Sequence, residues 1–189
     1  SSVWKKNCEE ERFLGVSLTG IYDCKVLYNA NGEELEKLKE IAVVTNELWA
    51  KKLGVNPSAA VTCVKPSGTV SQLCNSSSGI HPRYSSFYRR AVRGDKKDPI
   101  SQLLIDSGVP YEEDSYNKEA WVFSFPIKSP TKAITRHDIN PRSQLITWKT
   151  FAQHWCEHKP SMTCYVPEDK WVDVADWVWH NWDVVNGIS

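Results

Sequence analysis

The stretch AAVTCVKPSGTVSQLC, residues 59–74, places a strand, a tight turn and a helix start in direct succession. The apolar, β-branched run at 59–64 predicts a buried strand. Pro66 ends that strand, because proline has no amide hydrogen to donate to a neighbouring strand. Residues 67–69 then supply hydroxyl groups and one position without a side chain, and residues 70–74 are typical of the first turns of a helix.

The segments on either side continue the alternation of strand and helix. A turn at 29–32 precedes a long helix from Glu33, whose apolar residues keep helical spacing, and Gly54 lies where a C-terminal cap would be. We expect further helices at 99–107, 142–158 and after Pro167, and further strands at 120–128 and 161–166; periodicity leaves the segment 12–20 open between helix and strand. Strands that alternate with helices imply parallel pairing through helical crossovers. The sequence therefore predicts an α/β fold, with residues 1–189 forming a single segment.

Two local expectations accompany this fold. Residues 108–117 are expected to form a mobile loop. The helix after Pro167 is expected to turn one stripe inward, formed by Trp171, Val174, Val178 and Trp182.

Charge and composition exclude several classes of protein. Lys plus Arg and Asp plus Glu are both 23, so the net charge is zero and the overall field favours neither nucleic acid nor an anionic membrane. No apolar stretch approaches the roughly 20 residues that span a bilayer, and no secretory signal opens the chain. The six cysteines lack the spacing of a zinc site and are expected to be reduced thiols. A cytoplasmic protein is the default, and the missing initiator methionine suggests a piece of a longer chain.

The turn after the 59–64 strand has the properties of an anion site. The amides from Gly68 to Ser71 are the donors that a new helix leaves unpaired, Ser67 and Thr69 add hydroxyls, and Lys65 could add charge. The order of residues is not that of a Walker A loop. The alternative is that Ser67 or Thr69 is a plain helix N-cap.

Basic residues follow the turn. His81 could hydrogen-bond a phosphate or line the entrance of the site, or be a loop residue with a structural hydrogen bond. Four arginines follow as well, Arg83, Arg89, Arg90 and Arg93. They could form a phosphate-binding patch or a solvated, salt-bridged face, and the second explanation is favoured.

Several separate segments, in chain order, resemble the C-terminal part of the catalytic barrel of ribonucleotide reductases, most closely the adenosylcobalamin-dependent class. They are EEERFLGVSLTG (9–20), KPSGTVSQL (65–73), SGIHPRY (78–84), YRRAVRGD (88–95), WVFSFPIK (121–128) and GIS (187–189). The resemblance implies a ten-stranded α/β barrel, of which this chain would be the last few strand and helix units.

The resemblance also implies an activity. The intact enzyme would reduce ribonucleoside di- or triphosphates to deoxyribonucleotides for DNA replication through a cysteine thiyl radical, with adenosylcobalamin, a cobalt cofactor, as the radical generator. A thioredoxin-like dithiol protein would reduce the cysteines again, and deoxynucleotides would act as specificity effectors. The substrate phosphates would be held by the residues of the turn, Pro66, Ser67, Gly68, Thr69, Val70 and Ser71. Lys65 and His81 could line the site.

No catalytic cysteine is expected within this segment. Cys8 and Glu10 reproduce the cysteine-x-glutamate pattern of the family, but they lie too close to the turn in sequence and in highly charged surroundings. Cys63 is expected to be a buried strand thiol. The radical cysteine is expected upstream, and the reducing pair beyond Ser189, so the isolated fragment should be inactive.

Two alternatives stay open. One is the large subunit of an oxygen-dependent ribonucleotide reductase, although PSGT at 66–69 argues against it. The other is a non-catalytic interaction domain, in which the tryptophan-rich end is buried against a partner and the hydroxyls of Ser67 and Thr69 only cap a helix.

Overall fold

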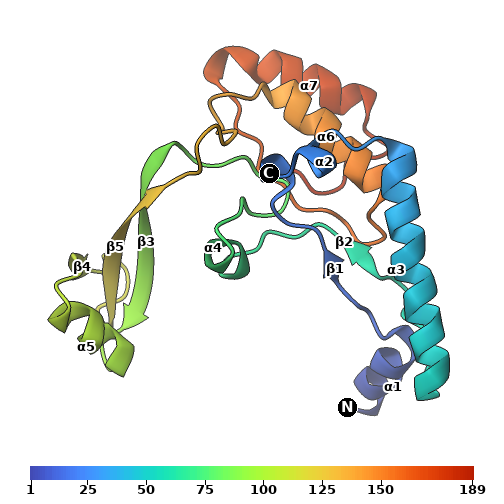
Figure 1. The fold of residues 1–189 in the computed structure, drawn as a ribbon, viewed down its shortest axis with the longest axis horizontal. Coiled ribbons are helices and arrows are strands. Elements are labelled where there is room, and N and C mark those ends of the chain that lie inside the picture. The colour runs from blue at the N-terminus through green and yellow to red at the C-terminus, as the bar shows by residue number, and fades with distance from the viewer. The chain divides into compact units, whose positions relative to one another are not determined.

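The computed structural model describes residues 1–189 and divides them into two compact units (Figure 1). Unit 1 consists of Ser1–Arg83 and Ile134–Ser189, and unit 2 of Tyr84–Ala133. Unit 1 contains α1 (Ser2–Glu11), β1 (Val16–Ser17), α2 (Lys25–Tyr28), α3 (Gly32–Leu53), β2 (Thr62–Cys63), α4 (Val70–Leu73), α6 (Pro141–His154) and α7 (Trp171–His180), with 3-10 turns at Ile21–Asp23 and Glu168–Lys170. Unit 2 contains β3 (Phe87–Asp95), α5 (Pro99–Asp106), β4 (Tyr111–Glu113) and β5 (Ala120–Lys128).

The long helix α3 begins and ends where its local sequence requires. The Asn31 side chain accepts from the Glu34 amide at 2.9 Å, and the Glu34 carboxylate accepts from the Asn31 amide at 3.0 Å, which is a capping box. Gly54 closes the helix in the left-handed region, with φ of 66°. The expected helix from Glu33 is therefore confirmed.

The strand before the turn is present and buried, but it is shorter than the apolar run. β2 pairs in parallel with β1, with Val16 opposite Thr62, so the open segment 12–20 contributes a strand. Near the end of the chain, residues 161–166 make a single parallel bridge, between Met162 and Ile188. Parallel pairing between segments distant in sequence is the pattern expected of an α/β fold.

Unit 2 corrects the expectation for the 120–128 strand. β5 forms, but it pairs antiparallel with both neighbours in a sheet of order β3-β5-β4. The expected mobile loop at 108–117 is wrong, because β4 lies within it and Tyr111 pairs with Phe123. Tyr111 also packs edge-on against Trp121, with ring centroids 5.0 Å apart. Such cross-strand aromatic pairs stabilise antiparallel sheets.

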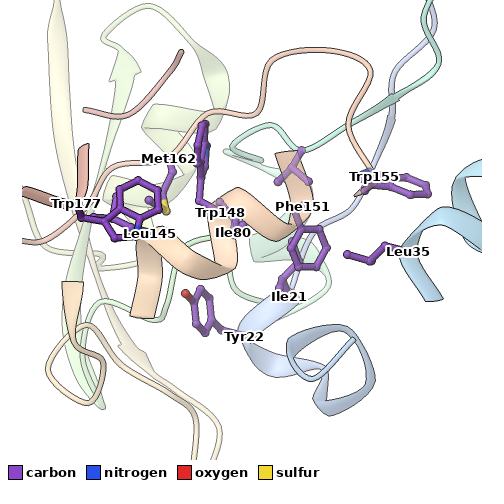
Figure 2. Close-up of a cluster of buried hydrophobic side chains, with 11 residues drawn as sticks. Ile21, Tyr22, Leu35, Ile80, Leu145, Trp148, Phe151, Trp155, Met162 and Trp177 are labelled. Carbon is purple, nitrogen blue, oxygen red and sulfur yellow. The ribbon is translucent and has the colours of Figure 1, made fainter. Parts of the chain in front are cut away.

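The core of unit 1 lies where α3 and α6 pack together and α7 covers α6 (Figure 2). Six large side chains of this core are fully buried: Ile21, Leu35, Ile80, Leu145, Trp148 and Phe151. Burying an aliphatic or phenylalanine side chain in this way contributes about 1.5–3 kcal/mol. No helix of the structure is both long and apolar enough to cross a bilayer.

The inward face of α7 differs from the expected stripe. Trp177 is 5% exposed and belongs to the core, whereas Trp171 and Trp182 are 60% and 72% exposed. Val174 and Val178 pack against the core as expected. The stripe that faces α6 is therefore centred on Trp177, which lies three residues after Val174 and directly before Val178.

Candidate functional site

The turn at 66–71 follows β2 and leads into α4, as the sequence predicts. Its hydroxyls do not cap that helix. Thr69 is the N-cap residue, but its side chain makes no capping hydrogen bond, and the Ser67 hydroxyl lies 2.9 Å from Thr19 Oγ1 instead. The capping explanation of these two hydroxyls is therefore wrong.

Three consecutive backbone amides of the turn are not used by the protein; two belong to the exposed residues Thr69 and Val70, and one to the fully buried Ser71. No protein acceptor takes the amide hydrogens of Thr69, Val70 or Ser71, and the Val70 side chain is 60% exposed. A Cβ placed on Gly68 would meet no atom within 4 Å. The amide of Ser67 points the other way and donates to Ser78 Oγ at 2.8 Å. Consecutive backbone amides with no protein acceptor are the donor set that suits an anion.

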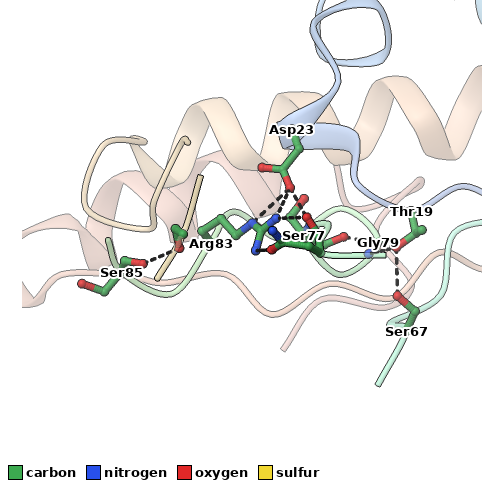
Figure 3. A network of polar contacts seen from close by, with 9 residues as sticks. Thr19, Asp23, Ser67, Ser77, Gly79, Arg83 and Ser85 are labelled. Carbon is green, nitrogen blue, oxygen red and sulfur yellow. Dashed lines mark hydrogen bonds and ion pairs between the residues drawn. The ribbon is translucent and has the colours of Figure 1, made fainter. Parts of the chain in front are cut away.

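A second loop, residues 75–83, supports the turn from behind (Figure 3). Gly79 has φ of 53°, and a Cβ there would lie 2.8 Å from the carbonyl oxygen of Lys65. Only glycine allows this close approach without strain. Thr19 connects this loop to the turn, because its Oγ1 accepts from the Gly79 amide at 2.8 Å and hydrogen-bonds to Ser67.

Arg83 anchors this second loop and is not available to a phosphate. Its buried guanidinium donates to Asp23 Oδ2 at 2.8 and 3.0 Å and to the Asn75 carbonyl oxygen at 2.5 Å. The Asp23 carboxylate also accepts from the amide of Ser77 at 2.6 Å. This arginine therefore fixes the loop, in agreement with the salt-bridged reading of the basic residues.

Arg93 is also paired, within unit 2. It forms an ion pair with Asp114. The amide of Tyr116, the Arg93 guanidinium and the amide of Asn117 hold the pKa of Asp114 below its usual range.

The two candidate lining residues have protein partners. His81 Nδ1 lies 2.9 Å from the Ser78 carbonyl oxygen, and its Nε2 accepts from the Thr163 amide at 3.0 Å. Both ring nitrogens therefore have protein partners, and neither is left for a phosphate. Lys65 Nζ donates to the Lys159 carbonyl oxygen and lies 3.5 Å from Ser161 Oγ.

A pocket of about 340 Å³ lies beside the turn. Pro66 and His81 line it together with hydroxyl-bearing residues, and the hydroxyls come from Ser161, Thr163 and Ser189. A larger cavity of about 780 Å³ lies on the sheet of unit 2; it is lined by Arg89 but by no residue of the turn and not by Lys65 or His81. Of the two, only the smaller pocket includes a residue of the turn, Pro66.

All six cysteines are free thiols. Cys8 is exposed on α1, beside a Glu10 that pairs with Lys6, and Cys63 is buried. Burial raises the pKa of Cys156 to about 12 and that of Cys164 to about 11, so both stay protonated at neutral pH. A raised pKa is the opposite of what a reactive cysteine needs, so Cys156 and Cys164 are not candidates for redox chemistry.

Sequence reasoning missed the residues that hold the turn in place. Thr19 and Ser78 lie within the similar segments 9–20 and 78–84, and Asp23 lies outside them, but no motif marks any of the three as a contact of the turn. The only local signal is that polar residues, Thr19 and Asp23, lie on either side of the apolar pair Ile21 and Tyr22.

The donor set of the turn fits a phosphate group. It consists of backbone amides and hydroxyls, and no group of three or more His, Cys, Asp or Glu side chains is arranged to hold a metal ion. These donors do not fit a corrin ring with its cobalt, and we assign no residue of this chain to that cofactor.

Comparisons with known proteins agree on one kind of enzyme. No protein-family model matches the chain. The adenosylcobalamin-dependent ribonucleoside-triphosphate reductase of Lactobacillus acidophilus is 25% identical over 204 residues, covering 92% of this chain and 27% of that protein. The enzyme of the same name from Lactobacillus helveticus is 31% identical over 148 residues, covering 64% of this chain and 20% of that protein.

A solved structure shares the fold. The crystal structure of a B12-dependent, class II ribonucleotide reductase matches with a TM-score of 0.77 and 21% identity, over 98% of this chain and 30% of that chain. The expected fold, a portion of an α/β barrel of this type, is confirmed. The chain spans less than a third of the length of the relatives it matches.

Proposed function

Because this chain is related to adenosylcobalamin-dependent ribonucleoside-triphosphate reductases, we propose that it forms part of the catalytic barrel of a ribonucleotide reductase. In this role the turn at 66–71 holds the phosphates of the ribonucleotide substrate. The observation that carries the proposal is the set of amides at Thr69, Val70 and Ser71, which no protein acceptor takes.

The turn contributes binding and orientation. Its amides, with the hydroxyls of Ser67 and Thr69, donate to the phosphate oxygens, and such charge-assisted bonds are about twice as strong as neutral ones. Fixing the phosphates restrains the ribose to which they are attached, which lowers the entropic cost of bringing it to the reacting groups. Adenosylcobalamin supplies radical chemistry in enzymes of this name, and no step of it is assigned to these residues.

The catalytic cysteines and glutamate are proposed to lie in other parts of the enzyme. Cys8 is exposed on a surface helix, and Cys63 is buried behind the turn. The fragment by itself is therefore expected to bind nucleotide without turning it over.

The same proposal extends to partners and location. It includes deoxynucleotide effectors, a thioredoxin-like reductant for the catalytic cysteines, and a cytoplasmic site of action. The free thiols support a reducing compartment.

The test is nucleotide binding to the full-length protein, measured by calorimetry with CTP and with cytidine. Replacing both hydroxyls, Ser67→Ala with Thr69→Ala, should weaken CTP binding by about 1.5–3 kcal/mol and leave cytidine binding unchanged. Ser107→Ala is the matched control, because that exposed hydroxyl donates only to the Leu103 carbonyl of its own helix. Equal CTP affinity in the double variant and the wild type, at equal thermal stability, would contradict the proposal.

A further inference from the structure

Thr19 lies directly behind the phosphate turn, and its hydroxyl contacts three groups (Figure 3). The Gly79 amide donates to Thr19 Oγ1 at 2.8 Å. Ser67 Oγ lies 2.9 Å from the same atom, and the Ser77 carbonyl oxygen lies 3.2 Å from it. Thr19 is half-buried, and its hydroxyl is the one side-chain group that hydrogen-bonds to the Ser67 hydroxyl.

Counting hydrogens limits how these groups can be arranged. A hydroxyl has one hydrogen to donate and two lone pairs that accept. The amide of Gly79 can only donate, so it occupies one lone pair of Thr19. The Thr19 hydrogen then has two acceptors within reach, the Ser77 carbonyl oxygen and Ser67 Oγ.

The second acceptor is the better one. The Ser77 carbonyl oxygen already accepts from the Gly20 amide at 2.8 Å, and it is the more distant of the two. Ser67 Oγ has no other protein partner.

We propose that Thr19 is a positioning residue, which donates its hydroxyl hydrogen to Ser67 and so leaves the Ser67 hydrogen to be donated to the substrate phosphate. The inference rests on the proposed function of the turn. The donors then run in one direction, from the Gly79 amide through Thr19 to Ser67, and each bond polarises the next. With the opposite arrangement Ser67 would donate to Thr19 and present only lone pairs to the phosphate oxygens, which repel it.

A bound phosphate selects the first arrangement. Phosphate oxygens accept hydrogen bonds and donate none at neutral pH, apart from a terminal group that is still protonated. The hydrogen of Ser67 therefore turns toward the anion, and Thr19 is the neighbour that satisfies the lone pair of Ser67 Oγ.

The test is a double-mutant cycle on CTP binding in the full-length protein, with thermal unfolding followed in parallel. Thr19→Val removes the hydroxyl at nearly constant shape, and we expect about tenfold weaker CTP binding when Ser67 is present. In the Ser67→Ala background the same change should alter binding by less than about twofold, because Thr19 acts through Ser67. Thr19→Ser should restore affinity to within about twofold of the wild type.

Each outcome decides the matter. An equal loss in both backgrounds would show that Thr19 only supports the loop, and no loss in either would show that it does not act on binding; both overturn the proposal. If Thr19→Val does not fold, Thr19→Cys gives the same comparison with a much weaker donor. A wild-type protein that binds CTP no better than cytidine would instead overturn the proposed function, whatever Thr19 does.

Discussion

Gly79 lies behind the turn with φ of 53°, and a Cβ there would be 2.8 Å from the carbonyl oxygen of Lys65. Gly54 also has a positive φ, 66°, but a Cβ there would meet nothing within 4 Å. The two positions therefore separate backbone strain from steric overlap. Gly54→Ala should lower the free energy of unfolding by about 1–2 kcal/mol through backbone strain alone.

Gly79→Ala should cost about 1–3 kcal/mol more than Gly54→Ala, since the Lys65 carbonyl must also move. It should weaken CTP binding as well, because that carbonyl lies next to Pro66 at the start of the turn. Urea denaturation and calorimetry measure the two effects. Equal stability losses at the two glycines would show that the contact behind the turn is not rigid.

The cysteines should differ in reactivity according to burial. At pH 8, an alkylating reagent should modify the exposed Cys8 and Cys74 first, whereas Cys156 and Cys164, whose pKa values are raised to about 12 and about 11, should resist in the native protein. Mass spectrometry of the alkylated protein gives the order. Rapid native modification of Cys156 would mean that its surroundings open far more easily than the structure indicates.

At the scale of elements, β2 depends on one carboxylate. Glu157 Oε2 accepts from the amides of Val61 and Thr62 at 2.8 and 3.2 Å. Partial burial acts to raise the pKa of Glu157, but these two amides, with Lys39 nearby, lower it below its ordinary value of 4.5.

This lowered pKa predicts an acid-sensitive contribution to stability. A carboxyl group with a lowered pKa in the folded state stabilises the protein above pH 4.5, and that stabilisation is lost as the pH falls through the folded-state value. Glu157→Gln should therefore lower the unfolding free energy at pH 7 and flatten its decline between about pH 5 and pH 3. Chemical denaturation across this range is the measurement. An unchanged pH profile would contradict the role of the charge.

Elements whose signals are local could be predicted, and those that depend on distant partners could not. Asn31 and Gly54 mark the ends of α3 within their own neighbourhood, and Pro99 and Gly108 do the same for α5. β3 was missed because its strand character comes from pairing with β5, more than twenty residues later in the chain.

The candidate site shows the same division. The order of strand, turn and helix around 66–71 could be predicted, since its signals are local. The supports of the turn could not, because Thr19 and Ser67 are separated by 48 positions and meet only through the parallel pairing of β1 with β2. Likewise, the exposed Trp171 and the buried Trp177 differ only through how α7 packs against α6.

At the scale of the whole molecule, the ends of the unit 2 segment are tied together within unit 1. The Arg83 amide donates to the Ile134 carbonyl at 2.9 Å, and the Arg136 amide donates to the Arg83 carbonyl at 2.8 Å. Replacing residues 84–133 by a Gly-Ser linker of about four residues should therefore leave unit 1 folded.

Thermal unfolding and tryptophan fluorescence measure this outcome. The fluorescence reports on unit 1, because the replacement removes only one tryptophan, Trp121. The shortened variant should keep the emission of the buried Trp148 and a single transition. A non-cooperative transition would show that unit 1 needs unit 2 in order to fold.

In the parallel pair β1 and β2, only the outer edge of β2 has its backbone groups paired. Beyond β2, the amides of Glu157 and His158 donate to the Thr62 carbonyl at 3.0 and 3.1 Å, while the Glu157 carboxylate takes the amides of Val61 and Thr62. β1 has no strand on its other flank. An additional strand can therefore pair with the free edge of β1, beside Val16, whereas the edge of β2 at Thr62 has no backbone groups left to pair.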